Sequence, residues 1–264
     1  MENQIWQDIL LVRKKSPLVL NITNYVVMNF SANVLLATGC SPVMAHAKNE
    51  VMDMVKIANA LVINIGTLSE HWVESMKLAL KRANELSKPV VLDPVGSGAT
   101  PYRTDTVNDL LSYGRFSVIR GNASEIMSIV SDEHKTKGVD SSESSDKAVN
   151  AAKWLNQKYN SIVCVSGATD YIVSNNRIAK IYNGHPMMTS VTGMGCAATA
   201  LIGGFIGSID DKFRATVSAM ALMGVAGELA VEKSEGPGSL MLNFIDKIYN
   251  ITKEEFLSSL KVEY

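Results

Sequence analysis

Apolar residues along the chain fall into short continuous runs, separated by longer stretches with helical spacing. Five of these runs are rich in β-branched and aliphatic side chains and are too short to be helices. They are residues 18–20, 61–65, 89–92, 116–119 and 161–165. Because the runs are continuously apolar rather than alternating, we expect both faces of their sheet to be covered. The pattern predicts an α/β fold with a mostly parallel central sheet flanked by helices on both faces.

Helical periodicity fills the stretches between these runs. Ser69 precedes one helix as an N-cap and Gly39 ends another. Two later runs, 171–173 and 178–182, flank a polar turn and predict a β-hairpin, and the chain after Gly193 is mainly helical. The predicted helices before that hairpin cover residues 26–38, 49–58, 69–86 and 145–158.

The polar, serine-rich segment 135–145 is the one candidate for a linker between two halves of the chain. A strand-and-helix pattern resumes directly after it, without a shift in composition. We therefore expect an exposed loop within a single domain that spans residues 1–264.

The amino-acid composition and charge exclude some classes of binding partner. The chain has 264 residues, 47% hydrophobic, and a formal net charge of −1, so it can bury a large core and carries no basic footprint for nucleic acid. Residues 1–6 lack the basic start of a signal peptide, and the apolar segment 195–209 is shorter than a membrane span. Three cysteines without a CxxC pair fit a reducing compartment. We expect a soluble, cytoplasmic protein without a membrane partner.

Candidate chemistry lies just after the apolar runs, where open parallel sheets bind their ligands. Polar and glycine-rich segments occupy these positions: residues 21–24, 66–67, 93–98, 120–125, 166–170 and 192–196. The last of them leads into an apolar helix, so backbone N–H groups of Gly193, Met194, Gly195 and Cys196 are candidates for an anion hole. It has neither the lysine of a P-loop nor the spacing of a dinucleotide fingerprint, and glycines here also fit a simple turn.

Three further residues each allow a functional and a structural interpretation. Asp93 follows a buried strand, where its carboxylate either holds magnesium or only shapes an Asp-Pro turn. Glu125 lies three residues after Asn122, which fits a ligand pair or a helix capping box. Arg120 either contacts nucleotide phosphates or forms a surface ion pair.

Two motifs together resemble a known superfamily. Residues 122–125 resemble the NxxE motif of ribokinase-like kinases, and residues 193–196 resemble their GxGD anion hole, with Cys196 where most members have aspartate. With this cysteine, the segments 24–26, 39–44 and 92–99 resemble the hydroxyethylthiazole kinases of thiamin salvage. The similarity covers about residues 17–238.

The resemblance implies transfer of the γ-phosphoryl group of ATP to the primary alcohol of 4-methyl-5-(2-hydroxyethyl)thiazole, with Mg²⁺ as cofactor. It also implies a homotrimer with active sites near subunit contacts. By similarity, the thiazole contacts Met44, Gly193 and Asn24; ATP contacts Arg120, Ser166, Asn122 and Glu125; and Asp93 and Glu125 organise magnesium, in part through water.

Cys196 then becomes the candidate catalytic residue. A helix start can lower a thiol pKa, which favours Cys196 as the base for the substrate hydroxyl over a role only in shaping the pocket. Met220 and Met223 lie at helical spacing and are expected in the core. The alternatives are another ribokinase-like enzyme, such as a sugar, pyridoxal or hydroxymethylpyrimidine kinase or a hydrate dehydratase, and a nucleotide-binding regulator that has lost turnover.

Overall fold

One nine-stranded sheet runs through the computed structural model, which describes residues 2–134 and 144–264, with side chains outside 131–145. The strand order is β2-β1-β3-β4-β5-β6-β7-β8-β9. Neighbouring strands from β2 to β6 pair in parallel, and β7, β8 and β9 continue the sheet in antiparallel pairing. The strands are β1 (Leu18–Ile22), β2 (Ser41–Met44), β3 (Ala60–Asn64), β4 (Val90–Asp93), β5 (Val118–Asn122), β6 (Ile162–Ser166), β7 (Asp170–Ser174), β8 (Arg177–Ile181) and β9 (Val262–Glu263).

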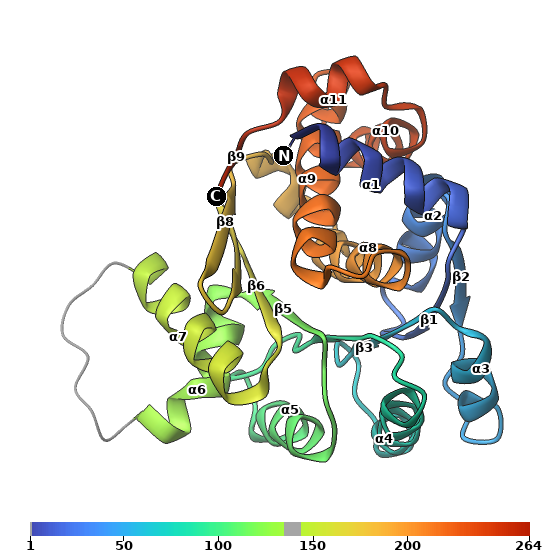
Figure 1. Cartoon of the computed structure of the whole chain (residues 1–264), viewed down its shortest axis with the longest axis vertical. Coiled ribbons are helices and arrows are strands. Elements are labelled where there is room, and N and C mark those ends of the chain that lie inside the picture. The colour runs from blue at the N-terminus through green and yellow to red at the C-terminus, as the bar shows by residue number, and fades with distance from the viewer. Residues whose placement is uncertain (1, 135–143) are drawn as a thin grey trace.

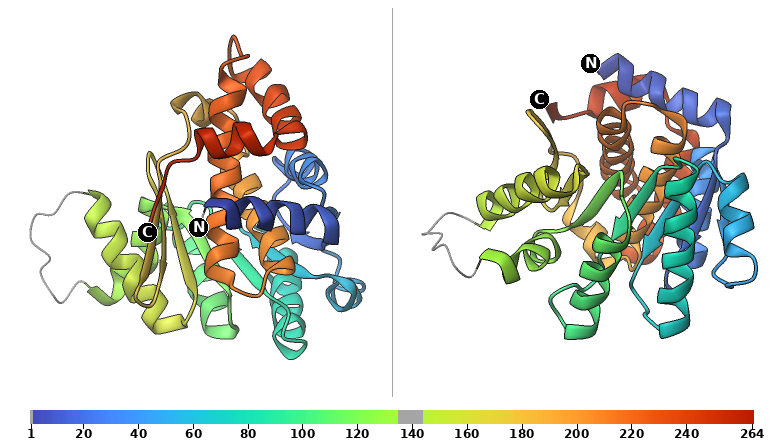
Figure 2. Two further views of the ribbon diagram at one scale, coloured as in Figure 1. Left: turned by 45° about the horizontal axis from the view of Figure 1, so that its top comes forward. Right: turned by 60° about the horizontal axis from the view of Figure 1, so that its bottom comes forward.

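Helices form a layer on each face of this sheet (Figures 1 and 2). One layer holds α1 (Glu2–Lys15), α2 (Met28–Thr38), α8 (Met194–Ser208), α9 (Lys212–Val231), α10 (Pro237–Asn250) and α11 (Lys253–Ser259). The other holds α3 (Val51–Ile57), α4 (Glu70–Glu85), α5 (Pro101–Tyr113), α6 (Ala123–His134) and α7 (Ser144–Tyr159). A short 3₁₀ helix, η1 (Pro186–Ser190), precedes α8.

Successive residues of each central strand supply two separate hydrophobic cores. Val19 and Val62 pack into the core under α8 and α9, whereas Leu20 and Leu61 pack into the core under α3 to α7. All four are at most 1% exposed. Because strand side chains alternate between faces, a continuously apolar run is what a sheet covered on both sides requires. The predicted fold class is therefore confirmed.

The five predicted strands and the hairpin are present, with end shifts of a few residues. The predicted helix from residue 26 begins at Met28. Six elements were not predicted outright: α1, α5, α6, η1, β2 and β9. Strand β2 is short and contains Pro42, which an edge strand tolerates because one side of it pairs with no neighbour. Most of the predicted loop 135–145, residues 135–143, lies outside the described residues.

Helix α9 is long and apolar enough to cross a membrane by length and composition alone, yet 78% of its most apolar stretch is buried inside the protein. It packs against α8, α10 and α1. A helix that is apolar on all sides is expected at the centre of a helical layer, where neighbours cover every face. Its hydrophobicity is that of a core helix.

Candidate active site

The carboxyl ends of neighbouring parallel strands meet the first turns of α8 at one edge of the sheet. Asn24 follows β1, Asn64 ends β3 and Asp93 ends β4. Cys196 and Thr199 belong to the first two turns of α8. This is the edge at which the sequence predicted the chemistry, because parallel strands all present their carboxyl ends on the same side.

A chain of hydrogen bonds joins these side chains. Asn24 Nδ2 donates to Asn64 Oδ1 at 2.8 Å, and Asn64 Nδ2 donates to Asp93 Oδ2 at 2.8 Å. The Thr199 hydroxyl donates to the same carboxylate oxygen at 2.7 Å. Asn24 Nδ2 also lies 3.5 Å from Cys196 Sγ, within hydrogen-bonding range for sulfur. The network thus connects the cysteine at the helix start to the aspartate at the end of β4.

Asp93 keeps one carboxylate oxygen free of these bonds. Oδ2 accepts from both Asn64 and Thr199, whereas the buried Oδ1 has no partner among the described residues. Burial raises the pKa of Asp93 to about 6, against the opposing attraction of the nearby Arg120 guanidinium. A buried carboxylate oxygen without a donor is suited to a hard cation or to a water bound to one, so this residue fits magnesium.

Glu125 and Asn122 form the capping box that the sequence left open. Asn122 Oδ1 accepts from the Glu125 N–H at 2.9 Å, and Glu125 Oε2 accepts from the Asn122 N–H at 2.8 Å. The other carboxylate oxygen, Oε1, accepts from the Gly96 N–H at 2.9 Å. Each carboxylate oxygen of Glu125 therefore already accepts a hydrogen bond from a backbone N–H. The residue fixes the loop after β4 to the start of α6, and any contact with a cation would be an additional one.

The glycine-rich turn at α8 has the geometry of an anion site. Gly193 is the N-cap with φ +89°, a left-handed conformation that favours glycine. The first intrahelical backbone bond runs from the Ala197 N–H to the Gly193 carbonyl, so the N–H groups of Met194, Gly195 and Cys196 precede it. These free donors, together with the helix dipole, favour an anion at this end of α8.

A cavity of about 790 Å³ opens beside this turn. Arg120 and Ser166 line it on the sheet side, with Arg120 Nη2 donating to Ser166 Oγ at 2.7 Å. Burial opposes the charge on Arg120, but nearby carboxylates led by Asp93 outweigh it and raise the arginine pKa. Gly195 lies so close to Arg120 that a Cβ on it would be 2.8 Å from Nη1. The anion turn and the guanidinium therefore face one ligand space.

Part of the cavity lining is apolar. Met220 and Met223 of α9 line it beside Met188 of η1, and both α9 methionines are also buried in the hydrophobic core as predicted. Sulfur side chains are polarisable and adapt to flat ligands. The cavity lining thus combines these apolar side chains with the Arg120 cation and the anion-binding turn.

The structure groups most of the predicted residues into two sets and leaves Glu125 and Met44 outside both. The cavity is lined by Arg120, Asn122, Ser166, Gly193, Met194 and Gly195, whereas Asn24, Asp93 and Cys196 belong to the hydrogen-bonded chain and are not part of that lining. Met44 ends the edge strand β2, opposite Asn21 of β1, and does not line the cavity in the described part of this chain.

The pKa of Cys196 shifts in the direction opposite to the one expected from the helix start. Burial, assisted by the Asp93 carboxylate, raises the pKa of the Cys196 thiol to about 11. The helix start was expected to lower this pKa, but partial burial of the side chain disfavours the charged thiolate by more than the helix dipole stabilises it. The free thiol is therefore protonated at neutral pH.

Three residues of this edge escaped the sequence reasoning: Asn64, Thr199 and Arg103. Asn64 was visible as the single polar residue inside the apolar run 61–65. A buried amide in a strand needs partners, and that requirement alone was a signal for a hydrogen-bond network. Thr199 and Arg103 lie outside the polar segments that follow the apolar runs, so a search of the strand ends passed over both.

The arrangement of the sheet and its two helical layers is a ribokinase-like fold. A ribokinase-like superfamily protein from Enterococcus faecalis V583 has the same fold, with a TM-score of 0.66 at 12% identity over 89% of this chain and 88% of that one. A model of the hydroxyethylthiazole kinase family matches residues 9–254, and the chain belongs to this family.

Two relatives show how closely the chain follows that family. It is 52% identical to the hydroxyethylthiazole kinase of Syntrophus aciditrophicus over 258 residues, which cover 97% of this chain and 96% of that protein. The structure of a hydroxyethylthiazole kinase protein from Pyrococcus horikoshii OT3 superposes with a TM-score of 0.92 at 41% identity. That superposition covers 99% of this chain and 98% of the other.

Proposed function

We propose that this protein transfers the γ-phosphoryl group of ATP to the primary alcohol of 4-methyl-5-(2-hydroxyethyl)thiazole, yielding the phosphate ester and ADP in thiamin salvage. One observation carries the proposal beyond family membership. The cavity lined by Arg120 includes Gly193, Met194 and Gly195 of the α8 turn, whereas the chain from Asn24 reaches Cys196, the next residue of the same turn. A nucleotide on one side and an alcohol on the other would meet at the free N–H groups of this turn.

On the nucleotide side, we propose that the methionines of the cavity lining contact the adenine base and that Arg120 and Ser166 contact the phosphates. Guanidinium groups pair well with phosphate oxygens because their donors form a planar fork. Asn122 and Glu125 would serve ATP chiefly by holding the loop after β4 in place, as their reciprocal hydrogen bonds support.

Magnesium would be held by Asp93 through Oδ1, with Glu125 contributing through water. When bound, the ion neutralises charge on the phosphates. The remaining work falls to the chain itself: the α8 turn binds the transferring group, and Asn24 orients the alcohol. Phosphoryl transfer has a loose transition state, so positioning and charge stabilisation supply most of the rate enhancement.

The catalytic role of Cys196 stays a proposal with two forms. A thiolate would accept the hydroxyl proton, whereas a protonated thiol would shape the alcohol site while the proton leaves with the product phosphate. The raised pKa of Cys196 supports the second form in the free protein. Variants of Cys196 distinguish these two forms of its role.

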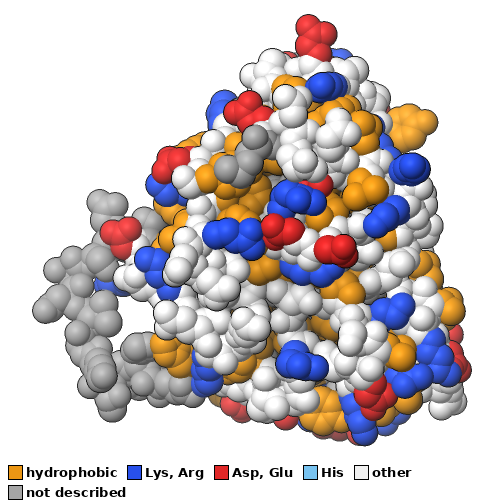
Figure 3. All heavy atoms as spheres, in the orientation of Figure 1, with side chains coloured by type: hydrophobic (Ala, Val, Ile, Leu, Met, Phe, Trp, Pro, Cys, Tyr) orange, Lys and Arg blue, Asp and Glu red, His pale blue; other side chains and the backbone are white. Residues whose placement is uncertain are grey.

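We also propose a homotrimer in the cytoplasm. Tyr25 and Val26 are 64% and 63% exposed although they adjoin the site residue Asn24, and Met44 lies on the edge strand. If a neighbouring subunit covered this region, Met44 would lie at the interface, in a thiazole site shared between two chains. On the face in Figure 3, basic and acidic side chains are interspersed, which favours small-molecule partners over nucleic acid.

The test is ADP release from ATP and Mg²⁺ with single alcohols: hydroxyethylthiazole, hydroxymethylpyrimidine, pyridoxal and a panel of sugars. We expect release that depends on the thiazole and exceeds that with every other alcohol. Preference for another alcohol would indicate a different ribokinase-like kinase. Binding of ATP without turnover on any alcohol would indicate a regulator.

A further inference from the structure

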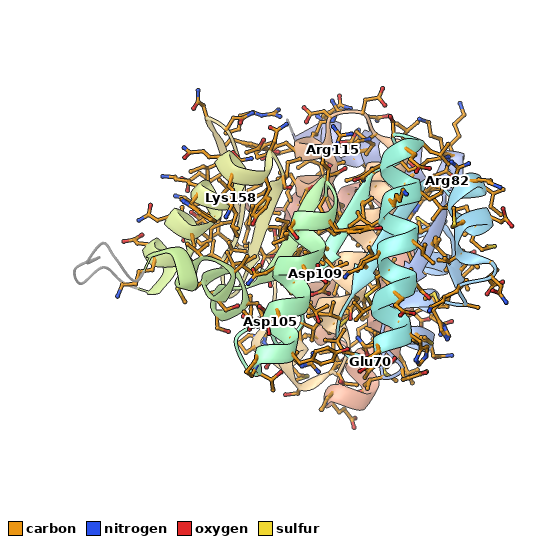
Figure 4. The ribbon with its side chains drawn as sticks, turned by 90° about the horizontal axis from the view of Figure 1, so that it is seen from below. Glu70, Arg82, Asp105, Asp109, Arg115 and Lys158 are labelled. Atoms are coloured by element: carbon orange, nitrogen blue, oxygen red, sulfur yellow. The ribbon has the colours of Figure 1, made fainter. Side chains whose placement is uncertain are left out.

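Arg103 occupies a position that helix energetics disfavour. It lies in the first turn of α5, where its N–H donates to the N-cap hydroxyl of Thr100 at 3.3 Å. A helix N-terminus favours negative charge, and α5 has no acidic residue in its first turn. In Figure 4, Asp105 and Asp109 lie further along α5. A positively charged residue is disfavoured at the positive end of the helix dipole, so its presence here indicates that the side chain has another role.

That task is to bridge two loops at the active-site edge. Arg103 Nη1 donates to the Ile65 carbonyl at 2.9 Å and to the Val95 carbonyl at 2.6 Å, and Nη2 donates to the Gly66 carbonyl at 2.8 Å. The first and third carbonyls follow β3, and the second follows β4. Among the described residues, the guanidinium thus bonds to carbonyl oxygens and not to a carboxylate.

Both loops continue directly into the site. On the β3 side, a Cβ on Gly66 would overlap the Asn24 side chain, and the Gly66 N–H donates to Asn64 Oδ1 at 2.9 Å. Asn24 in turn reaches Cys196. Any movement of Gly66 would therefore shift Asn24 on the proposed alcohol-binding side of the site.

On the β4 side, the bridge reaches the phosphate-binding half. Gly96 follows Val95, packs against the Arg103 side chain and donates its N–H to Glu125. A Cβ on Gly96 would lie 3.2 Å from Arg103 Cδ. The loop that starts at Asp93 is therefore held between Glu125 and Arg103.

We propose that Arg103 is a positioning residue for phosphoryl transfer. By holding the loop after β3 against the loop after β4, it sets Asn24 and Cys196 at a fixed place relative to Asp93 and Glu125. It touches neither substrate and acts through backbone carbonyls. Lysine can replace it only in part, because an ammonium does not present the planar fork that reaches these three carbonyl oxygens.

The experiment compares Arg103→Ala and Arg103→Lys with Arg82→Ala. Arg82 lies at the opposite end of α4 from Glu70, as Figure 4 shows, and pairs with Glu85 at 3.0 Å. We expect Arg103→Ala to lower kcat about 10²-fold, the effect of a misplacement of about 1 Å, and Arg103→Lys to lower kcat less. KM for ATP should change little, because Arg120 and Ser166 lie on other strands. Arg82→Ala should keep the parent kcat.

Chemical rescue separates positioning from folding. Millimolar guanidinium should recover most of the lost kcat of Arg103→Ala, with no gain from equal concentrations of NaCl or urea and none for Arg82→Ala. A loss of kcat that guanidinium leaves unchanged, in a variant with the parent's Tm, would overturn the proposal. If Arg103→Ala does not fold, Arg103→Lys decides, and a parent kcat in that variant would also overturn it.

The kinetic part rests on the proposed function, so a second measurement is independent of substrate. Hydrogen exchange reports on the Gly66 and Gly96 amides, which bond to Asn64 and Glu125. Both should exchange faster in Arg103→Ala than in the parent and in Arg82→Ala. Parent exchange rates at both amides would contradict the bridge. Absence of thiazole-dependent turnover in the parent would contradict the proposed function alone.

Discussion

Thr199 donates its hydroxyl hydrogen to Asp93 Oδ2 across 2.7 Å, joining the second turn of α8 to the end of β4. The two residues are 0% and 1% exposed, so water cannot replace this bond. With Oδ2 occupied by Thr199 and Asn64, only Oδ1 stays available to a cation or its water. The hydroxyl therefore fixes the orientation of the carboxylate that we assign to magnesium.

Thr199→Val removes this donor while keeping the side-chain volume. We expect kcat to fall about 10-fold or more, because a hydrogen bond to a charged group contributes about 1.5–3 kcal/mol. Thr199→Ser keeps the hydroxyl and should retain most of the parent kcat. Steady-state kinetics with a parallel Tm measurement tests this pair, and equal kcat values for the two variants would remove Thr199 from the account.

Gly195→Ala tests the closeness of the anion turn to Arg120. The added Cβ would lie 2.8 Å from Arg120 Nη1, so the guanidinium, whose Nη2 bonds to Ser166, must shift. We expect KM for ATP to rise about 10-fold or more through loss of a charge-assisted contact. The control is Gly238→Ala, where a Cβ would meet nothing within 4 Å. A parent KM in Gly195→Ala would argue against Arg120 as an ATP contact.

Cys196 variants separate the two forms of its catalytic role. We expect Cys196→Asp to remain active or to improve, because aspartate supplies the carboxylate usual at this position. Cys196→Ala should slow turnover without abolishing ATP binding, measured by calorimetry. A loss of about 10²-fold or more would indicate general base catalysis. Turnover of Cys196→Ala at the parent rate would exclude a proton-accepting role.

The pH dependence of thiol alkylation tests the raised pKa directly. With a pKa of about 11, Cys196 is protonated near pH 8, and its alkylation rate should rise about tenfold per pH unit up to that value. Peptide mass spectrometry after iodoacetamide treatment isolates this cysteine from buried Cys40 and Cys164. Had the helix start lowered the pKa, the rate would be flat above neutral pH, and a flat profile would contradict the structure.

Much of the fold was predictable because its determinants are local. Residues 61–63 are continuously apolar, and burial on two faces follows from that alone. The convergence of Arg120, Ser166 and Gly193 on one cavity was also predictable, since parallel strands end at a common edge. Whether each residue has the role assigned to it stays a prediction.

The remainder depends on tertiary contacts that no local pattern contains. The pKa of Cys196 follows from its depth beneath the strand ends, which the helix start does not reveal. The bridge made by Arg103 joins an α5 side chain to the backbone carbonyls of residues 65, 66 and 95. Every residue has a backbone carbonyl, so the sequence does not show which of them accept a hydrogen bond. Strand β2 was missed because Pro42 is disfavoured in strands except at an edge.

The measurement that tests the central claim most directly is ³¹P NMR of the reaction of ATP, Mg²⁺ and hydroxyethylthiazole with the parent protein. We expect a phosphate monoester of the thiazole to accumulate in step with ADP, without inorganic phosphate. ADP that appears only with inorganic phosphate, or a monoester that forms faster from another alcohol, would contradict the account.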